Sequence, residues 1–323
     1  MEVKETPHKA LLDRETPQKA MAEGYGAQLD ILTDMVDYTS NLMPRLFEQS
    51  ERNLRDLMVC YSLLKQFAVM LDAVDVLLRV GAVTAAYVPA RAAFEASLYI
   101  EWILVSDGEK KARYYYVGNV RAERKWGERV SKSSPESAAF AEDMKQLGAD
   151  LYSNRAELDF EGTKFIAAAN SVLAQPAFSD TNAAFEACIA KKTKPGKRPP
   201  NDPHWYVLLG KPSIRSIAKE LMRLPEYIVH YGKGSQVVHS TSIKDHLKFQ
   251  ETGATAHPIR NLAGVHFLLN YVLSNAMHTF MRTRAFYRSE ELPRYGAKYI
   301  EDWQSAFMKI PSIKIESISQ KRP

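Results

Sequence analysis

The sequence predicts an all-α fold, a multi-helix bundle, on three observations. Apolar residues recur at helical spacing through most of the 323 residues. Helical segments do not alternate with strand-like ones, as they would in an α/β protein. Neither a glycine-rich phosphate loop nor a G-x-S-x-G sequence occurs, so a doubly wound nucleotide-binding fold is not expected. The length suits one large helical domain or two, with an ample core.

The composition is that of a soluble globular protein, with 46% hydrophobic and 25% charged residues. A formal net charge of +5 permits nucleic acid or another acidic partner without requiring one. Cys60 and Cys188 lack the spacing of metal ligands, so we interpret both as small core residues in a reducing compartment. Neither a metal ion nor a cofactor is expected.

The N-terminal segment, residues 1–24, is predicted to be a polar arm. Glu5–Ala10 has a near-repeat in Glu15–Ala20, and each copy contains a Thr-Pro pair that is typical of a helix start. The segment contains no apolar signal sequence, which favours a cytoplasmic protein. The arm is interpreted either as a mobile segment with two short helical turns or as a contact to a second subunit.

Residues 25–308 are predicted to form a single helical domain. The longest apolar run, 54–80, contains six charged residues, so it is interpreted as a buried helix and no membrane partner is expected. Gly81 ends this helix, and Asp107-Gly108 forms the turn after the next one. Helices are expected over 28–80 with a break near 49–53, over 83–105 and 109–130, from Ser133 to about 190, after Ser213, and over 259–288.

Residues 191–203 form the clearest loop in the sequence. Four prolines and a glycine interrupt regular structure there, and five basic residues favour solvent. A second loop is expected over 251–258, before the last long helix. The C-terminal tail, 309–323, contains an alternating segment over 310–318 that predicts one short strand or extended chain on the surface.

A polar ladder, Tyr231, Ser235 and His239, interrupts an apolar helical segment. Spacing of four places these side chains on one helical face. Gly232 and Gly234 lie among them and each weakens the helix by about 1 kcal/mol, which makes sense if another backbone or a ligand comes close. His239 could take a proton from Ser235, but no acid adjacent in sequence completes a hydrolase triad. A buried hydrogen-bond network is the alternative.

A second polar pair, Arg91 and Glu95, has the same spacing in the most apolar helix expected, 83–105. The only other charged residue in that range is Glu101. We therefore expect Arg91 and Glu95 to be at least partly buried, and each to need compensation. One interpretation is a structural ion pair; the other has Arg91 binding a phosphate or carboxylate, for which its planar fork is suited.

Four stretches, taken in order, resemble an uncharacterised bacterial family, domain of unknown function fifty-six seventy-seven. They are Arg91–Ala96, Lys111–Tyr115, Gly210–Ala218, and the series Tyr227, Tyr231, Ser235, His239 and Ser240.

The resemblance to this family extends over roughly residues 55–290. It implies an α-helical fold and marks Arg91, Glu95, Ser235 and His239 as signature positions. The family tends to carry glycine after the histidine, where this chain has Ser240. The resemblance supplies no activity.

The segment Arg260-Asn261 with His266 resembles the signature of HEPN-type helical domains, many of which are metal-independent ribonucleases of toxin and phage-defence systems. Their chemistry needs these residue types, because histidine takes the proton of a ribose 2′-hydroxyl while arginine stabilises charge on the phosphate. Pro258 would place the segment at a helix start. The alternative is a structural arginine at that start and a histidine in a hydrophobic groove.

Basic and aromatic residues are interleaved between Arg113 and Arg129. Arg121 and Arg124 could contact an RNA backbone while a tyrosine or Trp126 stacks on a base. The alternative is a helix with core aromatics on one face and solvated charges on the other.

Two functional hypotheses follow from these patterns. The first is a HEPN-like effector acting on RNA, a metal-independent endoribonuclease of bacterial phage defence, in which Arg260 and His266 or Arg91 and His239 act. The second is a non-catalytic interaction or scaffold protein whose polar network is structural and which binds a protein partner or a second copy of itself.

Overall fold

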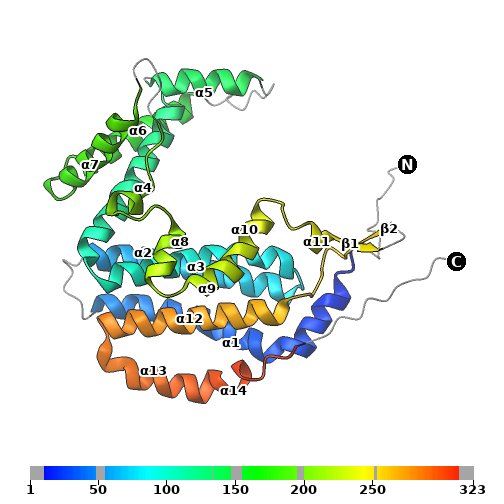
Figure 1. The fold of residues 1–323 in the computed structure, drawn as a ribbon. Helices are drawn as coiled ribbons and strands as arrows, with labels where there is room; N and C mark the ends of the chain where they lie inside the picture. The colour runs from blue at the N-terminus through cyan, green and yellow to red at the C-terminus, as the bar shows by residue number, and fades with distance from the viewer. Residues whose placement is uncertain are drawn as a thin grey trace. The chain divides into compact units, whose positions relative to one another are not determined.

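The computed structural model describes residues 11–48, 55–132, 134–146, 155–194, 200–250 and 253–312. It is all-α apart from one two-stranded hairpin, as predicted (Figure 1). Where the sequence predicts a single domain over 25–308, the chain divides into two compact units. The first combines residues 1–106 with 214–323, and the second is 107–213.

The first unit is built around four long helices. α2 (Arg55–Arg79) packs against both α1 (Glu15–Glu48) and α3 (Val83–Val105), and α12 (Val265–Tyr287) packs on α3 and α1. The observed α3 begins and ends at the residues that the sequence predicts. Its start follows the turn at Gly81, which takes a left-handed φ of +74°. Phe67, Phe94 and Phe280 are fully buried in the core.

Shorter elements complete the first unit. They are α8 (Ile214–Glu220), α9 (Leu224–Glu226), the π-helical turn η2 (Tyr227–Tyr231), α10 (Gly232–Val238), α11 (Ile243–His246), β1 (Leu247–Gln250), β2 (Gly253–Ala256), η3 (Ser289–Glu291), α13 (Leu292–Lys298), the π-helical turn η4 (Tyr299–Trp303) and α14 (Gln304–Phe307). η2 and α10 both contact α3, so α3 is the scaffold on which the polar ladder rests.

The expected arm of residues 1–24 is shorter than predicted, because α1 already begins at Glu15. The carboxylate of Asp13 caps this helix by accepting hydrogen bonds from the backbone N–H groups of Glu15 and Thr16 at 3.0 and 3.1 Å. Pro17 lies against the turn at Gly81, where an added Cβ would come within 2.6 Å of the proline. Residues 1–10 lie outside the described residues.

The expected loop over 251–258 is also corrected. Residues 247–256 contain an antiparallel hairpin in which Leu247 pairs with Ala256 and Gln250 with Gly253. The last long helix begins at Val265 instead of 259, since the hairpin and a turn take up the residues before it. The alternating segment at 310–318 lies outside the described residues beyond position 312.

The second unit consists of α4 (Gly108–Val130), α5 (Pro135–Gln146), α6 (Arg155–Leu173), α7 (Pro176–Lys192) and the short 3-10 helix η1 (Trp205–Leu209). α4 and α6 cross closely at two glycines: a Cβ on Gly127 would lie 2.8 Å from the carbonyl oxygen of Gly162. The predicted loop over 191–203 begins two residues later than expected, because α7 continues through Lys192. Residues 193–194 and 200–203 have no helix or strand, and 195–199 lie outside the described residues.

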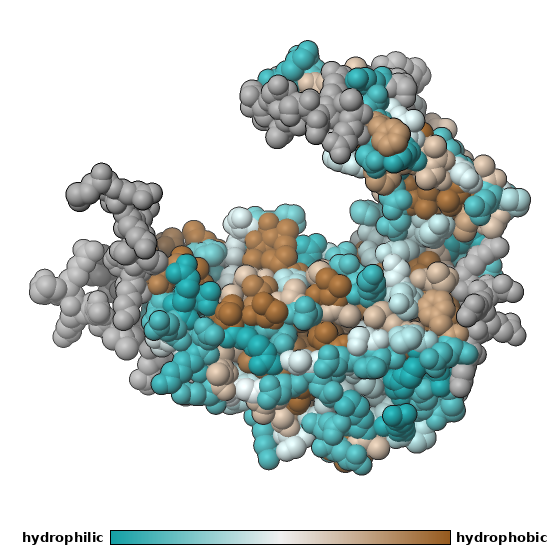
Figure 2. Space-filling model, turned by 180° about the vertical axis from the view of Figure 1, so that it is seen from behind, coloured by the Kyte–Doolittle hydropathy of each residue, from teal (hydrophilic) through white to brown (hydrophobic). Residues whose placement is uncertain are grey.

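α2 is long and apolar enough to cross a membrane by length and composition, over Asp56–Arg79. Half of its most apolar 18-residue stretch is buried inside the protein, where α2 packs against α1 and α3. Met58, Val69 and Val76 of this helix remain exposed. The face shown in Figure 2 carries brown apolar patches within a mostly hydrophilic surface.

Candidate functional site

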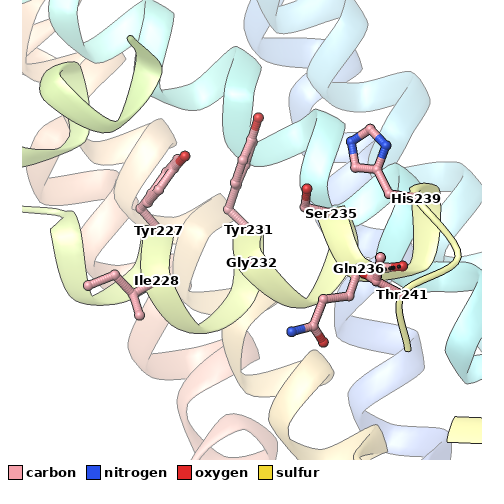
Figure 3. Close-up of a pocket in the computed structure, with 8 residues that line it drawn as sticks. All are labelled: Tyr227, Ile228, Tyr231, Gly232, Ser235, Gln236, His239 and Thr241. Carbon is pink, nitrogen blue, oxygen red and sulfur yellow. Dashed lines mark hydrogen bonds between the residues drawn. The ribbon is translucent and has the colours of Figure 1, made fainter. Parts of the chain in front are cut away.

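The ladder lies on one face of η2 and α10, as its spacing predicts. Figure 3 shows Tyr231, Ser235 and His239 pointing to the same side of the helix, with Tyr227 as an additional rung. The rings of Tyr227 and Tyr231 stack with centroids 4.6 Å apart and planes inclined by 18°. An open cavity of about 330 Å³ is lined by Tyr227, Ile228, Tyr231, Gly232, Ser235, Gln236, His239 and Thr241.

Gly234 allows the ladder helix to approach α3 closely. A Cβ at this position would lie 2.7 Å from the carbonyl oxygen of Tyr87 and 2.7 Å from the Cβ of Arg91. Both distances are shorter than the contacts that Cβ atoms make in proteins. The expectation that a glycine here admits another backbone is therefore confirmed for Gly234. Gly232 is different, because the nearest atom to an added Cβ is the Tyr227 carbonyl oxygen at 3.9 Å.

Arg91 joins α3 to the ladder. Its Nη2 donates a hydrogen bond of 2.9 Å to the hydroxyl of Tyr231, and its guanidinium carbon lies 4.5 Å from the centre of that ring. Both Arg91 and Glu95 are half-buried, as expected for polar groups in an apolar helix. Arg91 Nε is enclosed and has no hydrogen-bond partner among the described residues, so the guanidinium has unused donor capacity.

Tyr231 is a neutral phenol at neutral pH. The side chain is buried, with the residue 8% exposed, and burial raises the pKa of Tyr231; the Arg91 hydrogen bond lowers it and the charge of Glu95 raises it. Glu95 therefore lies within electrostatic reach of the ladder. Arg91 and Glu95 of α3 thus both act on Tyr231 of η2.

The outer end of the ladder is open to solvent. Ser235 is half-buried, while His239 is exposed at the C-terminal end of α10. The chain leaves this helix through a Schellman motif, in which the N–H of Ser240 bonds to the Val237 carbonyl at 3.2 Å and that of Thr241 to the Gln236 carbonyl at 2.9 Å. Ser240 takes a φ of +54°, the left-handed conformation that glycine favours.

The second predicted set, Arg260, Asn261 and His266, does not line this cavity. Arg260 and Asn261 precede α12 instead of starting it. The guanidinium of Arg260 donates to the carbonyl oxygen of Val80, just beyond α2, and Asn261 Oδ1 accepts the backbone N–H of Ala263 at 2.9 Å. His266 lies in the first turn of α12, with its ring 3.9 Å from that of Phe267. These contacts are structural.

Arg121 and Arg124 are also occupied by carboxylates. Arg121 is 1% exposed and pairs with Asp202 at 2.8 Å and with Glu186. Arg124 pairs with Glu128 at 3.3 Å and Glu186 at 3.5 Å. Arg121 is too buried to reach an RNA phosphate, and both guanidiniums are paired with carboxylates, so the structure favours the solvated-face and core interpretation of α4 over RNA binding at these two residues.

Sequence reasoning missed a buried polar cluster centred on Arg223. Arg223 Nη2 donates to Asn275 Oδ1 at 2.8 Å, and its Nε donates to Glu226 Oε2 at 2.6 Å. Its Nη1 lies 3.4 Å from Glu101 Oε2. Glu101 in turn lies 3.1 Å from His278. The one signal in the sequence was Glu101 itself, a charged residue in an apolar helix. Its partners are Arg223, just before α9, and two residues of α12, and they share no motif with it.

The comparisons with known proteins identify a family and no activity. No curated protein and no solved structure matches the chain. Residues 57–255 match the family described as Family of unknown function (DUF5677). The matched residues include α3, the ladder and the hairpin up to its last residue. The HEPN-type resemblance stays a prediction. Since the match covers more than half of the 323 residues, this protein belongs to the family of unknown function DUF5677.

Proposed function

We propose that this protein binds RNA at the ladder and cleaves it without a metal ion, as an effector of bacterial phage defence. The observation that carries the proposal is that the ladder lines an open cavity, with His239 exposed, whereas a purely structural network would be enclosed. A volume of about 330 Å³ falls within the range of small-ligand sites, about 300–1,000 Å³, and suits one nucleotide unit of a strand.

In this proposal His239 removes the proton of a ribose 2′-hydroxyl, and the 2′ oxygen attacks the adjacent phosphorus. The bond to the 5′ oxygen breaks, that oxygen takes a proton from water, and a 2′,3′-cyclic phosphate remains. The hydroxyl of Tyr231 and the guanidinium of Arg91 behind it would stabilise the charge that develops on the phosphate. The ring of Tyr227 offers a surface on which a base can stack.

The test is incubation of the purified protein with mixed RNA, followed by analysis for products ending in a 2′,3′-cyclic phosphate. His239→Ala is expected to abolish cleavage and Tyr231→Phe to reduce it. The matched control is His246→Ala, because His246 is also exposed, lies in the neighbouring α11 and does not line the cavity. The ribonuclease proposal fails if the wild type is inert with and without candidate partners, or if His246→Ala loses activity equally.

A non-catalytic interaction protein is the second candidate, because apolar residues beside the ladder are exposed. Ile228, Val229, Val238 and Ile243 have exposed fractions of 56, 59, 47 and 56%. Exposed apolar residues near one site are typical of protein-binding surfaces when they form a patch. Under this proposal Val229→Asp would abolish assembly with a protein partner or second copy, measured by sedimentation, while His239→Ala would leave assembly unchanged.

A further inference from the structure

We propose that His278 and Arg282 form a second site, independent of the ladder, which binds a phosphate group. The two residues stand one turn apart on α12 and therefore on the same helical face. Neither lines the ladder cavity. Their side chains are 35% and 41% exposed, so both reach solvent from a helix that is otherwise largely buried.

A buried carboxylate holds both side chains from behind. Glu101 of α3 has a side chain that is 8% exposed, and its oxygens lie 3.1 Å from His278 Nε2 and 3.6 Å from Arg282 Nε. Burial alone would raise the pKa of Glu101, but His278, together with Arg223 and Arg282, lowers it below its ordinary value. Glu101 therefore remains ionised and fixes both neighbours without facing the solvent.

The contacts with Glu101 leave the outer edges of both side chains for a ligand. His278 Nε2 is enclosed, so the exposed part of the imidazole is the remainder of the ring, where Nδ1 is the only polar atom. Arg282 uses Nε toward Glu101, which leaves its terminal nitrogens as donors. Nδ1 of the imidazole can accept a hydrogen bond from a phosphate hydroxyl while the guanidinium donates to the phosphate oxygens, so the two side chains can bind one phosphate group.

The charges around the cluster favour an anion on the solvent side. Behind Glu101, Arg223, which immediately precedes α9, is also compensated by Glu226, at 2.6 Å. Among the described residues, Glu101 is thus the one carboxylate that forms an ion pair with His278 or Arg282. The carboxylate lies inside and the Arg282 guanidinium outside, an order that attracts anions. Phosphate is the anion we commit to, because guanidinium geometry matches its oxygens.

The experiment uses the full chain with carbon-13 labelled histidine and follows the imidazole resonances during titration with inorganic phosphate. His278→Gln assigns the His278 signal. We expect a saturable shift of that signal at millimolar phosphate, absent with chloride at equal ionic strength. Arg282→Gln should weaken the response about tenfold, which corresponds to about 1.4 kcal/mol, and Arg282→Lys should weaken it less.

The matched control is Arg79→Gln, because Arg79 is also 41% exposed and also pairs with a buried carboxylate, Asp75, 9% exposed. This variant should bind phosphate as the wild type does. Titration with a ribonucleoside monophosphate and with a dinucleotide diester then distinguishes a monoester ligand from a strand backbone. The proposal is overturned if phosphate produces no saturable shift, if chloride produces the same one, or if Arg282→Gln responds like Arg79→Gln.

Discussion

Replacing Gly234 with alanine is expected to push α10 away from α3 and to break the contact between Arg91 and Tyr231. The added Cβ would come 2.7 Å from both the Tyr87 carbonyl oxygen and the Arg91 Cβ. Backbone and Cβ atoms cannot rotate aside, so the helix itself must move. Overpacking of this kind costs about 1–3 kcal/mol.

Gly232→Ala isolates this steric effect. Gly232 lies in the same helix with a helical φ of −57°, and nothing comes nearer than 3.9 Å to an added Cβ. Both variants gain about 1 kcal/mol of helix propensity, which cancels in their difference. Gly234→Ala should therefore be less stable than Gly232→Ala by about 1–3 kcal/mol, and Gly232→Ala should be more stable than the wild type.

Thermal unfolding measures this difference, since 1 kcal/mol shifts the melting temperature by about 2–4 °C in domains of about 150–250 residues. Ligand binding at the ladder cavity, or RNA cleavage where it is detected, should fall in Gly234→Ala and persist in Gly232→Ala. Equal melting temperatures for the two variants would show that α10 and α3 are not in close contact, and the geometry of the ladder site would have to be abandoned.

Three other predictions concern single positions. Ser240→Gly should stabilise the protein by about 1 kcal/mol, because the left-handed φ of +54° costs a side-chain-bearing residue that much; an unchanged melting temperature would contradict the Schellman ending. Arg121→Ala should destabilise the second unit by about 1.5–3 kcal/mol, because it removes the charge-assisted hydrogen bonds to Asp202 and Glu186, although Lys125 and Arg124 still pair with these carboxylates. RNA binding per folded molecule should stay constant; reduced RNA binding would restore a role for α4. Burial lowers the pKa of His230 to about 4, so the unfolded chain takes up a proton at higher pH than the folded one. Stability should fall as the pH drops from about 6.5 toward about 4, and His230→Gln should flatten that slope in melts at several pH values.

Local signals in the sequence predicted most of the first unit. The bounds of α3 followed from Gly81 and from the turn at Asp107, whose backbone conformations end helices whatever lies around them. The ladder followed from spacing alone, since a helix fixes which side chains share a face. The hairpin at 247–256 was missed because its two strands are short and largely exposed, so they carry no apolar alternation to distinguish them from a loop.

Long-range pairing is what the sequence could not supply. Arg91 was expected to need compensation, but its hydrogen bond to Tyr231 joins positions 140 residues apart. Arg121 looked like an exposed basic residue because its partners, Glu186 and Asp202, lie on other elements. A helical pattern shows which face a residue occupies, and only the packing of elements shows whether a carboxylate covers it.

The π-helical turn η2 has a consequence for how this segment can change during evolution. A π-helical turn contains one residue more than an α-helical turn, so every side chain after it is rotated by about 100° relative to a continuous α-helix. Ser235 and His239 follow the turn, while Tyr227 begins it. Deleting a single residue within η2 would turn the later rungs away from Tyr227 without altering any of their identities. The number of residues in this turn is therefore under as strong a constraint as the polar side chains themselves, and chains with an altered length here should lose the site even where all its residues remain.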